Sequence, residues 1–408
     1  MDAVACLLPQ DWMTARETRH VIQAIERLGG HVRFVGGAVR DALLGRPVSD
    51  VDLATDVAPD AVIARLGQAG IKVVPTGLAH GTVTAVHAGR HFEITTLRRD
   101  VEADGRRAKI AYTDDWAEDA ERRDFTVNAL FAGGDGLIFD PVGGLDDVLA
   151  RRVRFVGDPA RRITEDVLRL LRYYRMLARL GIHGIDPASR AACRAHAHLL
   201  PGLSGERVRS EIERILAVAD PRPVARLLEE DGILAPLLPA APGFARLERL
   251  VPTEPAADWL RRLAALIDGG IAEAERAADR LRLSRHETAR LVALAGPWGA
   301  DDVPVGEKAC RDRLYAIGAE TLRDRALLAA AAGADPDGRA GEAVAAAAWM
   351  ERPVFPLRGR DVLALGVPRG AAVGRLLAAV ERWWAADGYR ADAAACRERA
   401  AVLARAGG

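Results

Sequence analysis

The stretch Phe34–Thr55, FVGGAVRDALLGRPVSDVDLAT, decides the fold of the first part of the chain. A short apolar run ends in Gly36 and Gly37, and Ala38–Leu44 then has the spacing of a helix. A strand–glycine–helix turn leaves backbone N–H groups free to face an anion, and the helix dipole adds to the attraction. Arg40 lies in the first turn of the predicted helix, where a guanidinium suits the same anion. We therefore predict a phosphate-binding turn here, although a pair of glycines alone is typical of an ordinary tight turn.

Two aspartates follow at the end of this stretch. Asp50 and Asp52 are two residues apart on a predicted strand, so their side chains share one face, with Cα atoms about 6.5–7 Å apart. Carboxylates at that separation can hold Mg²⁺ together, although a polar strand end with solvated acids has the same pattern. Glu93, on the predicted strand His91–Leu97, is a candidate third carboxylate or else faces the surface.

Composition places the chain among globular proteins. Its 408 residues suggest two or three domains, and a content of 50% hydrophobic and 28% charged residues excludes a disordered chain. No run approaches the roughly 18 apolar residues of a membrane helix, and the first residues do not resemble a signal peptide. The four cysteines lack disulfide or metal spacing, which is typical of a reducing compartment. We expect a cytoplasmic protein with no membrane contact.

The charges are unevenly distributed, although 57 basic and 57 acidic residues give a net charge of zero. Acidic side chains outnumber basic ones in residues 1–150, whereas Arg151–Arg214 has roughly twice as many basic as acidic side chains. An acidic first part suits metal binding, and a basic region suits phosphates and nucleic acid.

The pattern of predicted elements changes once along the chain. Before Pro141 we predict strands at Val51–Ala54, Ile71–Val74, Thr82–His87 and His91–Leu97, the last two joined by a hairpin, and a loop at Val101–Asp119. Beyond it helical periodicity dominates, at Glu165–Leu180, Glu206–Val218, Pro223–Glu230, Ala257–Ile267, Ile271–Leu281, Arg285–Leu294, Leu322–Ala332 and Val373–Ala386, with a packed helix at Ala343–Ala348. The predicted fold class is α+β: a small mixed α/β head (1–148), an all-helical neck (149–222), and a helical body and tail (223–408).

Two further motifs carry charged residues at short spacing. Glu121–Leu130 reads ERRDFTVNAL, and Glu165–Arg175 reads EDVLRLLRYYR. Asp166 and Arg169 are three apart on a predicted helix, so they would be neighbours on one face. An ordinary surface ion pair would have the same spacing.

Taken together and in order, these motifs resemble the class II tRNA nucleotidyltransferases of the DNA polymerase β superfamily. That family comprises the CCA-adding enzymes and their bacterial poly(A) polymerase relatives, and the resemblance covers Phe34 to about Leu216. It implies a nucleotidyltransferase head in which Asp50 and Asp52 are catalytic and bind Mg²⁺. It also implies a nucleotide-binding set, in which Arg123 and Asn128 bind triphosphate and ribose and Asp166 and Arg169 read the base. That set consists of Gly36, Gly37, Arg40, Arg123, Asn128, Asp166, Arg169, Arg172 and Arg175.

The resemblance implies the addition of C, C and A to the 3′ end of tRNA from CTP and ATP, with release of pyrophosphate. DGR at Asp104–Arg106 retains the family's loop pattern, which favours the complete reaction over CC addition alone. Poly(A) or A-only addition is the alternative within the family, and a non-catalytic RNA-binding protein is the alternative outside it. The expected partners are tRNA, ATP and CTP, with no obligate protein partner.

Overall fold

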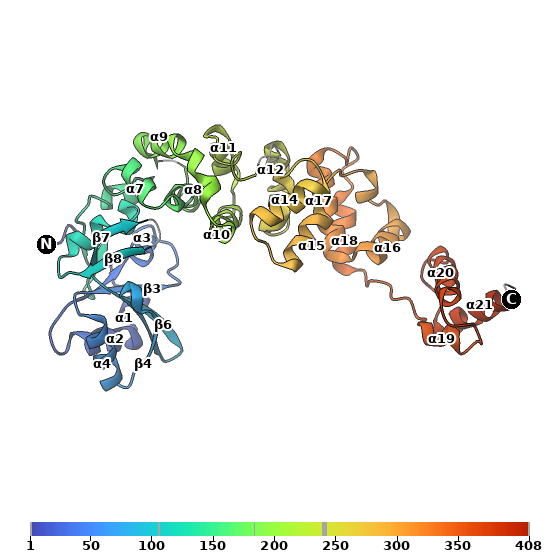
Figure 1. The fold of residues 1–408 in the computed structure, drawn as a ribbon, viewed down its shortest axis with the longest axis horizontal. Coiled ribbons are helices and arrows are strands. Elements are labelled where there is room, and N and C mark those ends of the chain that lie inside the picture. Colours follow the sequence, from blue (N-terminus) through green and yellow to red (C-terminus); the bar gives the residue numbers. More distant parts are fainter. Residues whose placement is uncertain (1, 105–106, 183, 239–242, 407–408) are drawn as a thin grey trace. The chain divides into compact units, whose positions relative to one another are not determined.

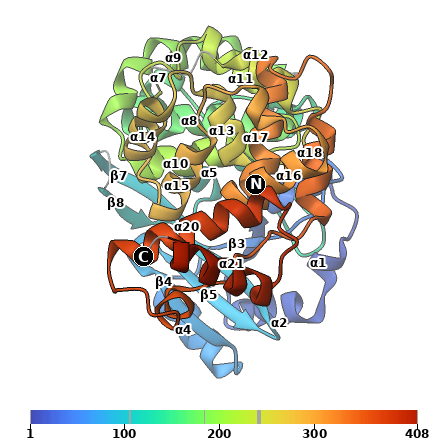
Figure 2. The ribbon, with the colours of Figure 1, turned by 90° about the vertical axis from the view of Figure 1, so that its right-hand side faces the viewer.

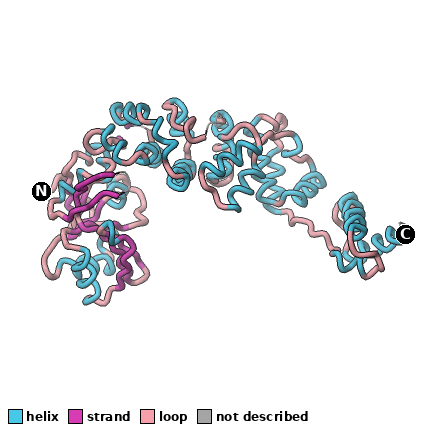
Figure 3. Tube along the Cα trace, viewed as in Figure 1, coloured by secondary structure: helices cyan, strands magenta, loops and turns pink. Residues whose placement is uncertain are grey.

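The chain divides into two compact units, Met1–Pro239 and Ala240–Gly408. The computed structural model describes residues 2–104, 107–182, 184–238 and 243–406 (Figure 1). Every strand among these residues belongs to the first unit, and the second unit is built of helices (Figure 3). The predicted α+β class, with a mixed head followed by helices, is confirmed. The predicted domain boundaries near residues 148 and 222 stay predictions.

An eight-stranded sheet forms the centre of the first unit. Its order is β1 (Ala5–Cys6), β10 (Leu137–Phe139), β9 (Phe131–Ala132), β2 (Val32–Val35), β3 (Val51–Thr55), β6 (Arg90–Thr96), β5 (Thr82–His87) and β4 (Lys72–Gly77). Strands β3 and β6 run parallel, and the other neighbours are antiparallel. The predicted hairpin is present: β5 and β6 are joined by Ala88 and Gly89, both with positive φ, as a two-residue turn requires.

Buried side chains alternate with exposed or half-buried ones along β5 and β6, whereas the consecutive residues Phe34 and Val35 of β2 are both buried. Helices α2 (Arg16–Glu26) and α4 (Pro59–Gln68) pack on one face of the sheet, below the strands in Figure 2. Phe34 makes an edge-to-face contact with Trp12 of α1 (Asp11–Thr14). Its neighbour Val35 points to the other face, into a cluster with Trp116 and Phe131. The period of two along β2 therefore supplies both layers of the head.

The prediction of a loop over Val101–Asp119 is wrong. Strands β7 (Arg98–Asp104) and β8 (Arg107–Tyr112) pair as a separate antiparallel ribbon, followed by α5 (Trp116–Glu121). This ribbon is a separate sheet of two strands. Alternation of apolar and polar residues is the pattern of a strand that packs one face on a core, and the pairing of β7 with β8 does not require that pattern. Residues 105 and 106 of the DGR pattern lie outside the described residues.

The prediction of one helix over Glu165–Leu180 is also wrong. Helix α7 (Pro159–Glu165) ends before Asp166, and α8 (Leu168–Leu180) begins after it. Asp166 has extended backbone angles (φ −152°, ψ 104°), and its carboxylate accepts a hydrogen bond from the backbone N–H of Leu168 at 3.2 Å. Aspartate competes for backbone donors in this way, which favours a helix boundary over a helix interior. Beyond residue 144, the first unit also contains α6 (Leu145–Leu149), the paired β11 (Arg152–Val153) and β12 (Gly184–Ile185), α9 (Pro187–Ala195), α10 (Gly205–Leu216) and α11 (Arg222–Glu230).

The second unit contains the helices α12 (Phe244–Leu250), α13 (Trp259–Leu266), α14 (Ile271–Arg280), α15 (Arg285–Leu294), α16 (Gly306–Ile317), α17 (Ala319–Ala332), α18 (Ala340–Trp349), α19 (Gly359–Leu363), α20 (Ala371–Ala386) and α21 (Ala393–Ala406). Helix α18 confirms the packed Ala-rich helix, because Ala343 and Ala346 are buried in a core with α16 and α17. The sequence patterns above do not predict α12, α16 and α21.

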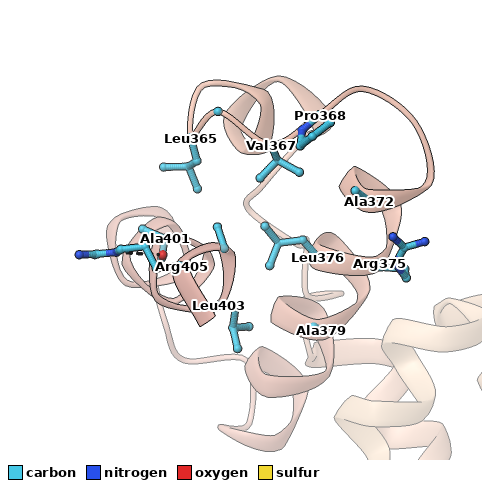
Figure 4. Close-up of a pocket in the computed structure, with 12 residues that line it drawn as sticks. Leu365, Val367, Pro368, Ala372, Arg375, Leu376, Ala379, Ala401, Leu403 and Arg405 are labelled. Carbon is cyan, nitrogen blue, oxygen red and sulfur yellow. Dashed lines mark hydrogen bonds between the residues drawn. The ribbon is translucent and has the colours of Figure 1, made fainter. Parts of the chain in front are cut away.

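A groove of about 740 Å³ lies among the last three helices. Leu365, Val367, Leu376 and Leu403 point into it, and Arg375 and Arg405 point away (Figure 4). None of the side chains predicted to bind nucleotide lines this groove. Within the described part of the chain, no helix combines the length and the apolar composition that crossing a bilayer requires.

Candidate functional site

Three carboxylates gather at one edge of the sheet. Asp52 on β3 is the direct register partner of Glu93 on the parallel strand β6, and Asp50 stands immediately before β3. Asp50 and Glu93 are exposed, whereas Asp52 is half-buried. The two readings of Glu93 are therefore not exclusive, because the side chain is exposed and also adjoins Asp52.

The nearby negative charges help to raise the pKa of Asp52. Burial, with the charges of Glu93 and Asp50, raises the pKa of Asp52 to about 6, and the nearby Arg123 acts in the opposite direction. Hard divalent cations prefer such carboxylate oxygens, so the donor set fits Mg²⁺. Among the described residues, no three His, Cys, Asp or Glu side chains already surround a single point. A cation would therefore have to draw these repelling carboxylates together.

The glycine turn lies beside Asp52 because of the sheet register. Phe34 of β2 pairs with Leu53 of the antiparallel β3, so Gly36, two residues after Phe34, emerges next to the start of β3. Gly36 has φ +70° and ψ −125°, a conformation that disfavours any residue with a Cβ, and α3 (Gly37–Leu43) begins directly after it. Arg123 Nη1 lies 3.9 Å from the position of a Cβ on Gly36. The turn, a guanidinium and the carboxylates thus adjoin one another.

A chain of polar contacts connects Arg40 with Arg172. Buried Arg40 donates to Asp41 at 3.0 Å and to the Asn128 side-chain oxygen at 2.5 Å. Asn128 donates in turn to Asp124 at 3.2 Å, and Asp124 pairs with Arg172 at 2.6 Å. Against the effect of burial, Arg172 foremost keeps the pKa of Asp124 below its ordinary value. Arg40 also remains close to the glycine turn, with Nη2 3.6 Å from the Cβ position of Gly37.

Arg123 is held by an acid that the sequence reasoning did not identify. Asp119 of α5 accepts from Nη2 and Nε of Arg123 at 2.7 and 3.1 Å, and also from Arg122. Although burial acts in the other direction, Arg123 and Arg122 lower the pKa of Asp119. The spacing of four residues between Asp119 and Arg123 on a helical segment was the signal that could have revealed this pair.

Asp166 and Arg169 do not form the ion pair that a common helix face would allow. Asp166 accepts from Arg207 of α10 at 2.8 and 2.9 Å, and Arg169 pairs with Glu165 at 2.7 Å. Arg207 belongs to none of the sequence motifs described above. No short-range spacing could have identified it, because 41 residues separate it from Asp166.

Arg175 pairs with the buried Glu211 of α10 at 2.5 Å. This contact ties α8 to α10, while Arg172, one turn earlier on α8, faces Asp124 of the head. The structure thus connects Arg40, Asn128 and Arg172 through Asp124, and it places Arg123 and Arg40 beside the glycine turn. The base-reading candidates adjoin α10 instead.

Two family models match parts of the chain. The model described as "Poly A polymerase head domain" matches residues 32–154, and the one described as "Probable RNA and SrmB- binding site of polymerase A" matches residues 184–244. Among solved structures, the CCA-adding enzyme of Bacillus stearothermophilus, crystallised in complex with CTP, is 30% identical with a TM-score of 0.74. The alignment covers 91% of this chain and 93% of that enzyme. The chain belongs to the CCA-adding enzyme and poly(A) polymerase family.

Curated members of this family align with about half of the chain. The CCA-adding enzyme of Geobacillus thermodenitrificans is 39% identical over 248 residues, which is 60% of this chain and 57% of that protein. The mitochondrial CCA tRNA nucleotidyltransferase 1 of Danio rerio is 44% identical over 190 residues, 45% of this chain and 44% of that protein. The chain thus spans about half the length of the curated relatives it matches. These alignments agree with the family resemblance, whose most specific motifs lie in the first unit.

Proposed function

We propose that this protein adds C, C and A to the 3′ end of tRNA, using CTP and ATP and releasing pyrophosphate. The observation that carries the proposal is the position of Asp52 and Glu93, on the adjacent strands β3 and β6, next to Arg123 and the Gly36 turn. Acidic oxygens for a cation and donors for a triphosphate are the two requirements of nucleotidyl transfer. Family membership supports the same reaction.

In the proposed mechanism, Asp50, Asp52 and Glu93 would hold Mg²⁺. When bound there, the ion would neutralise charge on the triphosphate and lower the pKa of the attacking 3′-hydroxyl. Backbone N–H groups of the Gly36–Gly37 turn and the fork of Arg123 bind phosphate oxygens. The 3′-hydroxyl of the RNA gives its proton to water, and its oxygen forms a bond to the α-phosphorus. The bond from that phosphorus to the oxygen that bridges the α- and β-phosphates breaks, and pyrophosphate leaves with the electron pair.

Selection of the base is assigned to the neck. Asp166 accepts a hydrogen bond from the exocyclic amino group of C or A, and Arg169 donates to the adjacent ring acceptor. G and U present a carbonyl where Asp166 needs a donor, so buried groups would stay unpaired at a cost of about 1–3 kcal/mol each. Arg40 and Arg172 position Asn128 and Asp124, and Arg175 supports α8 through Glu211.

The test is incorporation of labelled CTP and ATP into a tRNA transcript that lacks its last three nucleotides, with Mg²⁺ present and a chelator control. We expect C, C and A to be added in order, and Asp52→Ala to abolish addition while leaving tRNA binding within about twofold. Absence of incorporation with any divalent cation would refute the proposal. Long A tails from ATP alone on generic RNA would favour a poly(A) polymerase. RNA binding without transfer would favour a non-catalytic role.

A cytoplasmic location is proposed with this function, since tRNA substrates and reduced cysteines both suit it.

A further inference from the structure

Arg162 is a charged residue whose guanidinium lies inside the protein, between the two halves of the proposed nucleotide site. Its side chain is 9% exposed, whereas that of the adjacent Arg161 on α7 is 80% exposed. A buried guanidinium needs several partners to offset its desolvation, so the identity of those partners indicates its purpose.

Those partners belong to both halves of the site. Nη2 of Arg162 donates to the backbone carbonyl of Arg122 and, at 2.5 Å, to that of Arg123. Nη1 donates to Glu165 at 2.5 Å. The first two contacts hold the segment that carries the triphosphate-binding arginine, about 40 residues away in the chain.

Glu165 extends the connection to the residue that reads the base. The same Oε2 that accepts from Arg162 accepts from Arg169 Nη1 at 2.7 Å, and Arg169 Nη1 also donates to the backbone carbonyl of Arg162 at 3.0 Å. Although burial alone would raise it, hydrogen bonding from Arg169 and the charge of Arg162 lower the pKa of Glu165. The acid is therefore ionised and able to hold both arginines at neutral pH.

We infer that Arg162 is a positioning residue that sets the distance between the triphosphate-binding and base-reading parts of the site. A nucleotide must bind Arg123 through its phosphates and Arg169 through its base at the same time. A small displacement of the segment that carries Arg123 relative to the segment that carries Arg169 would prevent this. Arg162 touches neither part of the nucleotide in this inference and acts through Arg123 and Glu165. The inference rests on the proposed function and goes beyond it, because it assigns the spacing of two subsites to one side chain.

The geometry of the guanidinium is essential to this role. Its fork reaches two carbonyls with one nitrogen and Glu165 with the other, whereas the ammonium of a lysine is a single point charge. Arg162→Lys therefore keeps the charge and loses the bridge. Arg161→Gln is the matched control. Arg161 lies on the same helix and pairs with the same Glu165 at 3.2 Å. Among the described residues, Arg161 makes no hydrogen bond or ion pair to the segment that carries Arg123.

The experiment measures steady-state CTP and ATP addition, misincorporation of UTP and GTP, and inhibition by inorganic tripolyphosphate for the full chain. For Arg162→Lys and Arg162→Gln we expect kcat/KM to fall about 10- to 100-fold, mainly through KM, with increased misincorporation. Tripolyphosphate, which engages the phosphate part alone, should inhibit with a constant within about twofold of wild type, because Asp119 still holds Arg123. Arg161→Gln should match wild type throughout.

The inference is overturned if Arg162→Lys behaves like wild type, since charge alone would then suffice. It is also overturned if tripolyphosphate inhibition weakens as much as CTP binding, since Arg162 would then merely support Arg123. Thermal unfolding of each variant separates these outcomes from loss of the fold, and Arg162→Lys keeps the test available if Arg162→Gln does not fold. Inactivity of the wild-type chain would instead refute the proposed function.

Discussion

Asp52 and Glu93 lie directly opposite each other on β3 and β6, the strands of the eight-stranded sheet that run parallel. Register partners on adjacent strands have their side chains on the same face of the sheet, so the two carboxylates face the same space. Like charges at such positions destabilise a sheet unless a cation joins them. The pairing therefore favours a functional reason for both acids.

Removing the charge of Glu93 should weaken Mg²⁺ binding and lower the rate of nucleotide addition. For Glu93→Gln we expect kcat to fall about 10- to 1,000-fold and half-maximal activity to require more Mg²⁺, because one anionic ligand is lost. Initial rates of CTP addition across a MgCl₂ series measure both effects. Asp60→Asn, at an exposed carboxylate in the first turn of α4, is the control and should leave both unchanged. A Glu93→Gln enzyme with the wild-type rate and Mg²⁺ requirement would show that Glu93 is only a surface residue.

Asp52 should make the metal-free protein less stable as the pH rises. Its pKa in the fold, about 6, exceeds the ordinary value of 3.8, so the folded state binds a proton more tightly than the unfolded state does. The resulting stability is fully present below pH 3.8 and is lost as the pH rises through 6. Allowing for solvent screening, the loss amounts to about 1–2 kcal/mol.

Asp52→Asn should remove this pH dependence. In chelator, we expect the variant to unfold at a higher denaturant concentration than wild type at pH 7.5, with the difference shrinking toward pH 5. The same variant should be inactive in CTP addition. Equilibrium denaturation at several pH values measures the effect, and equal stability of the two proteins at pH 7.5 would contradict it.

The grouping of Gly36, Asp52 and Glu93 is easier to predict from the sequence than the contacts of Asp166 and Arg169, and the reason is the range of the interactions. Gly36, Asp52 and Glu93 are brought together by strand register, which follows from local patterns of apolar residues. Asp166 was placed in a helix interior because its neighbours have helical spacing, but its own carboxylate caps the next turn. Its partner Arg207 arrives from another helix, and only tertiary packing decides such a contact.

Arg207 should influence nucleotide selection through Asp166. Because Arg207 grips both oxygens of Asp166, Arg207→Ala leaves the carboxylate free to rotate and should raise KM for CTP and ATP about 5- to 20-fold. Discrimination against UTP and GTP should decline with it. Arg209 lies two residues further along α10 and pairs with Glu213 at 3.8 Å. Arg209→Ala therefore serves as the control. Unchanged KM and unchanged misincorporation in Arg207→Ala would show that the contact is dispensable.

Asp324 should be important for the stability of the second unit. Buried Arg261 of α13 pairs with Asp324 of α17 at 2.8 Å and with Glu254 at 2.5 Å, and Arg290 of α15 reaches Asp324 at 2.7 Å. Removing the carboxylate leaves the buried Arg261 with only one of its two acidic partners and takes one from Arg290, so Asp324→Ala should lower the free energy of unfolding by about 3–5 kcal/mol.

The control for this change is Asp337→Ala, at an exposed acid 3.7 Å from Arg339, which should cost under about 0.5 kcal/mol. Denaturant unfolding followed by circular dichroism compares the three proteins. Because the proposed nucleotide site is built from residues of the first unit, CTP binding by folded Asp324→Ala should stay within about twofold of wild type. A paired replacement, Arg261→Met with Asp324→Leu, should recover part of the lost stability, since apolar side chains of similar volume often replace a buried ion pair without loss. Unfolding of Asp324→Ala at the wild-type denaturant concentration would show that the cluster contributes no net stability.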